Sequence, residues 1–347
     1  MSVSAFASAF SERLPELRER LDRVRLENGL ALDRASDPDR VSVAGCGFLA
    51  AVDAVVFPGD PAATAARLHR SLDLLIDGNL VDGADLNGGW FSHFVSPDGQ
   101  PLDDSEVSTI DTALLLAGHL MAAEHLKDAG GGHSYAGRVR EAIAMCDLRY
   151  VVRDGLISHG FTWPGGFGGG EPTPIKWLWD DTSEGSLLYW LFGQRLLTEG
   201  HRGDWWDPKI TRTDYPLFVY VYPLCFDWPG MAPEVTLQRE RWRAWLFEAL
   251  EHQWREHRVV GLTATDGPDG YSVDSPTLVA PVLLSALAAD PELPHIDRTL
   301  AKLPPEVDPL AMNYDLERDW SSDDVLSIDL GSALLAWHRI RTNGLLV

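Results

Sequence analysis

Cysteine is scarce in this sequence: only three of its 347 residues are cysteines, and their spacing suggests no pair. Cys46, Cys146 and Cys225 lie far apart and form no CxxC pair, so the sequence indicates neither a disulfide framework nor a thiolate zinc site. The segments around them are apolar, so we expect three free thiols in the core.

Long apolar runs are also missing. No uncharged apolar stretch reaches the roughly 18 residues that a membrane-spanning helix needs. The N-terminal segment has no basic region followed by an apolar run, so we expect no signal peptide and a cytoplasmic protein.

Basic residues are also few: the chain has 52 acidic residues and 29 basic ones, giving a net charge of −23. Such a chain is repelled by nucleic acids and by anionic lipid surfaces, so neither is an expected partner.

Apolar residues recur with helical spacing through most of the chain, whereas long alternating strands are rare. The spacing predicts helices at 4–28, 61–80, 107–127, 134–149, 181–198, 234–257, 276–289 and 324–342. No low-complexity linker divides the chain. We therefore expect one all-α domain over residues 1–347, a toroid of paired helices with long loops at one end, on which residues 1–40 pack as a helical segment.

Two of the predicted helices begin with the same pattern. Ser108-Thr109-Ile110-Asp111 and Asp181-Thr182-Ser183-Glu184 both match a capping box, in which the first and fourth side chains satisfy free backbone N–H groups. Asp111 and Glu184 are therefore either structural caps or carboxylates that do chemistry. Each follows a loop rich in Trp, Gly and further acids, which favours a functional role.

Aromatic and acidic residues in the long loops suit a carbohydrate site, because aromatic rings stack on sugar rings and carboxylates bind hydroxyl groups. The chain has 13 tryptophans, and some of them also serve the core. A further polar segment, Gly261–Tyr271, carries Asp266 and is either a plain turn or a pocket wall. No HExxH motif, His pair at i, i+4 or dinucleotide loop is present, so we expect no metal and no cofactor.

Six motifs occur in an order that resembles the glucoamylase-like glycoside hydrolases, a group that includes bacterial endo-β-1,2-glucanases and a domain of cyclic β-1,2-glucan synthases. They are "NGGWFSHFVSPDG", "SEVSTIDTALLLAGHL", "WDDTSEGSLLYWLFG", "PLFVYVYPLCFDWPG", "GLTATDGPDGY" and "DWSSDDVLSIDLGSALL". The resemblance covers roughly residues 40 to 342. It implies an (α/α)6 barrel whose open end holds a glycan.

Carried over by motif, the resemblance places Glu184 at the position of the general acid and Asp111 in the part of the cleft that contacts substrate. It places Asp266 in the segment after "GLTAT", where Thr265 replaces the Ser of the family. The aromatic run near residue 90 matches as well. The residues we expect to bind substrate are Trp90, Phe91, His93, Glu106, Trp163, Trp179, Asp180, Asp181 and Tyr271.

The chain also departs from the family pattern. After Tyr271 the usual Gly-Thr and Pro-Thr-Ala elements are missing, and near the C-terminus Leu330 and Ser332 stand where Gln and Pro are expected. These departures bear on the substrate more than on the fold.

Glycoside hydrolysis needs one carboxyl group that protonates the leaving oxygen and a second that activates water or attacks directly. We therefore expect a glycoside hydrolase acting on a β-linked glucan or oligosaccharide, with inversion implied by the resemblance. Glu184 is the candidate acid, and Asp111 and Asp266 orient the sugar and activate water; Asp180 or Asp181 is an alternative second carboxylate. The same fold also hosts cyclases, lyases and tailoring enzymes for small metabolites, so that function is the alternative. A non-catalytic glycan-binding protein is the third.

Overall fold

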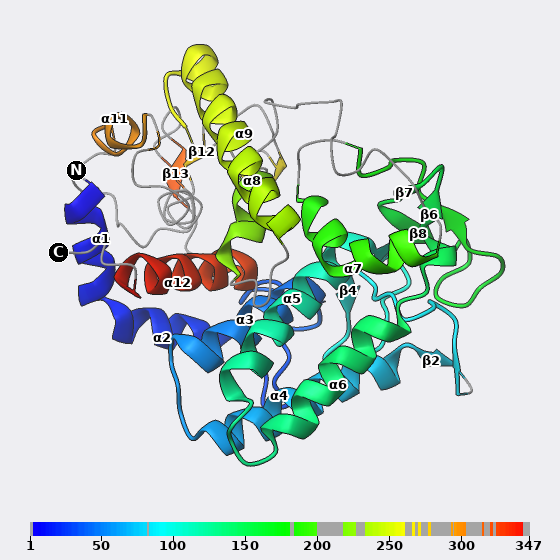
Figure 1. The fold of residues 1–347 in the computed structure, drawn as a ribbon. Helices are drawn as coiled ribbons and strands as arrows, with labels where there is room; N and C mark the ends of the chain where they lie inside the picture. Colours follow the sequence, from blue (N-terminus) through cyan, green and yellow to red (C-terminus); the bar gives the residue numbers. More distant parts are fainter. Residues whose placement is uncertain are drawn as a thin grey trace. The chain divides into compact units, whose positions relative to one another are not determined.

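The structure, a computed structural model, is mostly helical (Figure 1). It describes residues 3–81, 83–180, 184–199, 218–226, 233–260, 266–267, 270–271, 277–278, 293, 295–302, 314–315, 320–321 and 324–342. The chain forms two compact units. The terminal unit comprises residues 1–23, 182–184 and 211–347, and the central unit comprises residues 24–181 and 185–210. The sequence-based expectation of a single domain stays a prediction.

The central unit consists mainly of helices. They are α3 (Val43–Val55), α4 (Pro61–Gly78), α5 (Thr109–Leu126), α6 (Gly132–Met145), the 3-10 helix η1 (Leu148–Tyr150) and α7 (Ser186–Thr198). α3 contacts α5 along its length, and α6 contacts both α5 and α4 (Figure 1). All 13 residues of α3 are buried, so this helix is the middle of the core.

Short strands hold the loops of the central unit in place. They are β1 (Val41–Ser42), β2 (Leu80–Val81), β3 (Ala84–Asp85), β4 (Phe94–Val95), β5 (Val107–Ser108), β6 (Val152–Arg153), β7 (Leu156–Ile157), β8 (Gly160–Thr162) and β9 (Thr173–Pro174). β1 pairs antiparallel with β4, β2 with β3, and β6 with β7. β8 lies between β5 and β9 in a three-stranded antiparallel sheet. Two of these strands, β1 and β5, lead directly into α3 and α5.

The terminal unit is also helical. Its elements are α1 (Val3–Glu12), most of α2 (Leu14–Val24), α8 (Phe218–Val221), η3 (Tyr222–Cys225), α9 (Pro233–His257), α11 (Ile296–Leu300), α12 (Ser327–Thr342) and the strands β10 (Asp266–Gly267), β11 (Gly270–Tyr271), β12 (Thr277–Leu278), β13 (Tyr314–Asp315) and β14 (Trp320–Ser321). α12 contacts α1 (Figure 1), where Trp337 Nε1 donates a hydrogen bond to Ser11 Oγ at 2.8 Å. Arg339 donates to the carbonyl of Leu224, which joins α12 to η3.

Six of the predicted helices are confirmed to within a few residues at their ends. The predicted helix 4–28 is instead two helices with a turn at Arg13. Pro15 lies in the first turn of α2, where its missing N–H costs nothing, and it disfavours helical backbone just before it. The helix predicted from 276 is wrong at its start, because Thr277 and Leu278 form β12 and pair with β13; the rest of that segment lies outside the described residues.

The three cysteines are buried and none of them is in a disulfide, as the sequence predicted. Burial raises the pKa of Cys46 to about 12, so its thiol stays protonated and inert at neutral pH. In the part of the chain that the structure describes, no helix is long and apolar enough to cross a bilayer.

Candidate functional site

The central unit gathers a histidine between two carboxylates at the start of α5. Asp111 lies in the first turn of that helix and is 6% exposed. Its backbone N–H donates to the side chain of Ser108, the residue that caps the helix, at 3.3 Å. His93 Nε2 lies 3.7 Å from Asp111 Oδ1, and His93 Nδ1 lies 3.1 Å from Glu106 Oε1. The imidazole therefore bridges the two acids.

Backbone pairing sets this geometry. The N–H of His93 donates to the carbonyl of Glu106 at 2.9 Å, which holds the two residues opposite each other. The ring of His93 stacks on Phe94 with centroids 3.9 Å apart. The segment before β4 is thus held in register with the segment before β5, and the His93 side chain reaches Asp111 in the first turn of α5.

The charges of this cluster are coupled. Burial of the His93 ring opposes its charged form, but the charges of Asp111 and Glu106 and the Glu106 hydrogen bond outweigh it and raise the pKa of His93 to about 9. Burial raises the pKa of Asp111 above its usual value, although His93 and Ser108 pull it down. The hydrogen bond from His93 lowers the pKa of Glu106. At neutral pH the cluster therefore holds an imidazolium beside a carboxyl group that burial makes harder to ionise.

Most of the predicted stacking rings serve the core of the central unit. Trp90 is fully buried, donates from Nε1 to the carbonyl of Asp147 at 3.0 Å and packs on Phe192. Phe91 is 2% exposed. Neither ring has an exposed face on which a sugar can stack, so packing is the role that this geometry supports for both.

Trp163 and Trp179 are fixed by hydrogen bonds. Trp163 is half-buried, and its Nε1 donates to Asn87 Oδ1 at 3.0 Å. Trp179 is 7% exposed, stacks on His159 with centroids 3.8 Å apart, and donates from Nε1 to Thr109 Oγ1 at 3.0 Å. The Trp179 indole thereby braces the first residue of α5, two residues before Asp111.

An exposed ring in the same loop was not selected from the sequence. Trp177 is 61% exposed, and the Lys176 ammonium lies 4.7 Å from its ring centroid. Asp180 nearby is also exposed. Residues two apart in an extended segment face the same side, so no local pattern distinguishes the exposed Trp177 from the buried Trp179.

In the terminal unit, Glu184 lies near a hydrogen-bonded pair of buried polar residues. Tyr222, the first residue of η3, donates from its hydroxyl to Asp329 Oδ1 at 2.8 Å. Burial, the charge of Asp329 and its hydrogen bond, and the charge of Glu184 all hold the pKa of Tyr222 well above its usual value. The phenol therefore stays protonated, and its single proton is donated to Asp329.

The capping box predicted for Glu184 is wrong in its register. That pattern would place Glu184 in the third helical position, but α7 begins at Ser186, and the carbonyl of Gly185 accepts from Leu188 and Tyr189. Glu184 precedes the helix in a turn and is half-buried. The cap explanation for this side chain therefore loses its support, whereas Ser108 caps α5 as predicted.

Asp329 is the residue that sequence reasoning missed. It lies in the first turn of α12 and is 5% exposed. The available signal was Ile328-Asp329 shortly after an acidic loop and a serine, which repeats the Ile-Asp pair that ends the Asp111 motif.

The remaining predicted residues are only partly described. Asp266 and Tyr271 are directly paired in the hairpin of β10 and β11, while Asp181 lies outside the described residues. Among the side chains that the structure describes, no three of His, Cys, Asp or Glu are grouped as a bound metal ion would require.

No protein-family model matches the sequence, and no sequence among the curated proteins matches it. Solved structures do. A candidate glucoamylase of Bacteroides uniformis superimposes with a TM-score of 0.69 at 17% identity, over 95% of this chain and 90% of that one. The endo-β-1,2-glucanase of Chitinophaga pinensis, solved with sophorotriose and glucose, gives 0.68 at 14% identity, over 98% and 94%. The β-1,2-glucanase of Parabacteroides distasonis gives 0.68 at 14% identity, over 98% of this chain and 56% of that one.

At these identities the superpositions establish the fold. The resemblance to the glucoamylase-like glycoside hydrolases that the six motifs indicated is therefore confirmed in the fold of the chain, at low sequence identity.

Proposed function

We propose that the protein is a glycoside hydrolase acting on a β-linked glucan, with its helices arranged as an (α/α)6 barrel. The observation that carries the proposal is the arrangement around Tyr222, whose phenol is hydrogen-bonded to Asp329 and lies in the field of Glu184. Two carboxyl groups close to one buried site are what acid–base cleavage of a glycosidic bond requires.

Glu184 is the proposed acid. Its half-buried position in the turn before α7 leaves the side chain outside the helix's hydrogen-bond ladder. The charges of Glu184 and of Asp329 both act on the Tyr222 phenol. The acid of a glycosidase must keep its proton until the leaving oxygen takes it, and this is the role proposed for Glu184.

Asp329 is the proposed second carboxylate of the terminal unit. The Tyr222 hydroxyl donates to it, which stabilises the ionised form that a general base needs. Asp111 and Asp266 keep the roles inferred from sequence, in which they orient the sugar and activate water. Substitution of each by Asn decides among these three candidate bases.

Support for the substrate class comes from the fold and from the other cluster. The structures of similar fold include enzymes named for β-1,2-glucan. The exposed Trp177 ring and the His93, Glu106 and Asp111 cluster are the kinds of groups that bind sugar rings and hydroxyls. Inversion is part of the proposal.

The test is product release from a panel of β-glucans, linear β-1,2-glucan included, by the native protein, Glu184→Gln and Asp329→Asn. An aryl β-glucoside with an acidic phenol leaving group separates the roles, because such a group departs without protonation. We expect Glu184→Gln to lose glucan cleavage by at least about 100-fold yet to keep most activity on the aryl substrate. Asp329→Asn should lose both.

Glu124→Gln is the matched control, since Glu124 is an exposed residue of α5 that pairs with Lys127 just beyond the helix. It should behave as the native protein does. A native protein that cleaves no member of the panel, or a Glu184→Gln variant that cleaves glucan at the native rate, contradicts the proposal.

A further inference from the structure

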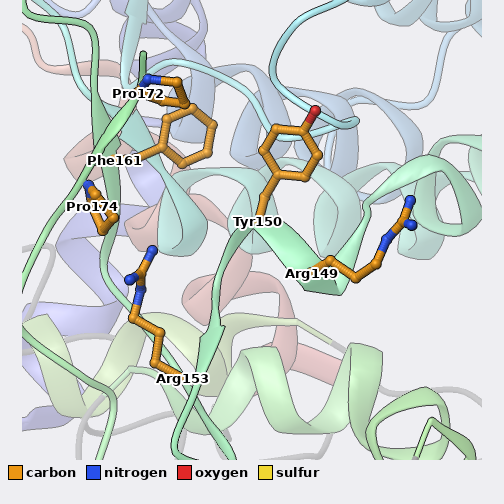
Figure 2. A pocket seen from close by; sticks show the side chains of 6 residues that line it. All are labelled: Arg149, Tyr150, Arg153, Phe161, Pro172 and Pro174. Atoms are coloured by element: carbon orange, nitrogen blue, oxygen red, sulfur yellow. The ribbon is translucent and has the colours of Figure 1, made fainter.

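The central unit has a surface pocket of about 450 Å³ (Figure 2). Its lining residues come from η1, β6, β8, β9 and the segment before β9, and they are Arg149, Tyr150, Arg153, Phe161, Pro172 and Pro174. In a chain with 52 acidic residues, this lining contains two arginines and no acid.

One wall of the pocket is a fixed aromatic surface. Tyr150 is 37% exposed, which is unusual among the large apolar side chains that the structure describes. Gly88 lies against its ring, since a Cβ at that position would be 2.8 Å from Tyr150 Cδ2. Phe161 packs beside it, with ring centroids 6.0 Å apart. The Tyr150 ring is thus supported from behind and keeps an accessible surface.

Prolines form part of the opposite wall. Pro172 and Pro174 lie on the far side of Phe161 from Tyr150 (Figure 2). Pro174 is in β9, where it is aligned with Phe161 of β8. Each proline ring fixes its own backbone φ angle, which limits the conformations open to this wall.

The two arginines differ in their electrostatic surroundings. Arg149 is neutralised by Asp147, with three of their nitrogen–oxygen distances between 2.5 and 3.0 Å. Its side chain is directed away from Phe161 and the prolines (Figure 2). Arg153 has no carboxylate partner among the described residues, and its guanidinium is turned toward Pro174 (Figure 2). The pocket therefore holds one uncompensated positive charge.

We propose that this pocket binds an acidic sugar unit, a pyranose ring that carries a carboxylate, with the ring against Tyr150 and the carboxylate paired with Arg153. A small inorganic anion has no use for the aromatic and proline walls. A neutral glucose unit leaves Arg153 without a counter-charge. A uronic acid satisfies both, because an arginine fork matches a carboxylate and an aromatic face matches the C–H surface of a sugar.

The pocket is linked through backbone pairing to the acid cluster of the central unit. Phe161 pairs with Val107 of β5, and Val107 directly follows Glu106. Neighbouring strands lie about 4.8 Å apart, so one strand spacing separates the strand that lines the pocket from the strand that carries the cluster. The pocket and the cluster around Asp111 therefore belong to the same small sheet of the central unit. In one respect the inference rests on the proposed function, because the carbohydrate class of the ligand is taken from it.

Binding of D-glucuronic acid and of D-glucose, followed by saturation-transfer NMR and calorimetric titration, tests the inference without any cleavage. We expect glucuronic acid to bind about tenfold more tightly than glucose, the difference that one charge-assisted hydrogen-bonded pair supplies. Arg153→Gln should reduce glucuronic acid to the affinity of glucose, and added salt should do the same in part. Tyr150→Ala should weaken both sugars.

Arg140→Gln is the matched control, because Arg140 is an exposed arginine of the same unit on α6, and it should leave binding unchanged. Melting curves establish that each variant is folded. Equal affinity for the two sugars in the native protein, or native glucuronic acid affinity in Arg153→Gln, overturns the inference.

Glu184→Gln separates this inference from the proposed function. The variant should keep its affinity for glucuronic acid while it loses cleavage. If the protein cleaves neutral glucan but shows no preference for glucuronic acid, the acidic-sugar site is contradicted and the proposed hydrolase activity is supported. If the protein binds glucuronic acid preferentially but cleaves no glucan, the proposed hydrolase activity is contradicted and the acidic-sugar site is supported.

Discussion

Gly118 of α5 lies directly against Gly47 of α3. A Cβ at position 118 would lie 1.9 Å from the carbonyl oxygen of Gly47, and a Cβ at position 47 would lie 2.3 Å from the carbonyl oxygen of Leu114. The two backbones are in contact because neither glycine has a side chain to separate them. This contact sets the position of α5, and with it the position of Asp111 at the start of that helix.

Gly118→Ala should therefore destabilise the protein strongly. The obstacle to the new methyl group is backbone on the neighbouring helix, which cannot move aside as the end of a flexible side chain can. Overpacking of this kind costs about 1–3 kcal/mol or more of unfolding free energy. Urea unfolding followed by circular dichroism measures the change.

Gly137→Ala is the control for that substitution. Gly137 is also inside a helix, α6, but a Cβ there meets nothing within 4 Å. Replacing glycine by alanine at an open helical position stabilises by roughly 0.5–1 kcal/mol, through helix propensity and the unfolded chain. If both variants change stability in the same direction, the close helix contact is not what limits residue 118.

Amphipathic helices were predictable from the sequence because their apolar residues recur with helical spacing. α3 was missed for the opposite reason. Its sequence, VAGCGFLAAVDAV, is apolar on nearly all sides, and all of it is buried, so no periodicity marks it as a helix. The break at Arg13 was missed because Phe6, Phe10, Leu14, Leu17 and Leu21 keep helical spacing across it, although Pro15 marks the place.

The carboxylates of the candidate site were predictable where a helix start marks them. Asp111 follows the cap Ser108, and the pattern gives both residues. Which tryptophans could stack on sugar rings was less predictable, because the sequence around a loop tryptophan does not show whether its ring faces solvent or packs inward. Trp90 is buried by contacts with residues far along the chain, Asp147 and Phe192 among them, and no local pattern records those contacts.

The charged His93 makes stability depend on pH. Its pKa rises from 6.5 to about 9 in the folded protein, because Asp111 and Glu106 outweigh the effect of burial. A group whose pKa is raised by folding contributes stability that is complete below its unfolded pKa and is lost as the pH passes its folded pKa. That window runs from 6.5 to about 9.

We expect the stability advantage of the native protein over His93→Gln to shrink by ~1–2 kcal/mol across this window, after allowance for the solvent that screens a partly exposed ring. Melting temperatures of both proteins across this pH range measure it. A difference that stays constant with pH shows that His93 is not held in its charged form.

His119 produces the opposite dependence. Its ring is 1% exposed, and Nδ1 lies 2.8 Å from the Tyr135 hydroxyl. Burial lowers the pKa of His119 from 6.5 to about 3. The unfolded chain therefore takes up a proton that the folded protein refuses, so stability is complete above pH 6.5 and falls as the pH drops toward 3.

His119→Phe keeps a ring in this position but cannot titrate. It should be less stable than the native protein near neutrality, because the Tyr135 hydroxyl loses its Nδ1 partner. Between pH 6.5 and about 4 the native protein should lose ~2–3 kcal/mol that the variant does not lose. Urea unfolding at several pH values checks this, and parallel pH profiles for the two proteins contradict it.

Tyr222→Phe tests the pair that carries the proposed function. The substitution keeps the ring in its buried position and removes only the hydroxyl that donates to Asp329 at 2.8 Å. Loss of a donor to a buried charged group costs about 1–3 kcal/mol of stability, whatever the role of Asp329.

If Tyr222 is purely structural, the Tyr222→Phe enzyme should be less stable, but its folded fraction should work at the native rate. A phenol that orients a catalytic carboxylate predicts that kcat of the folded enzyme falls by about tenfold or more, while KM for the glucan changes little, because the hydroxyl acts on the water-activating group and not on sugar binding. Activity assayed well below the melting temperature separates the two, and an unchanged kcat would assign Asp329 to the core and return the search for the base to Asp111 and Asp266.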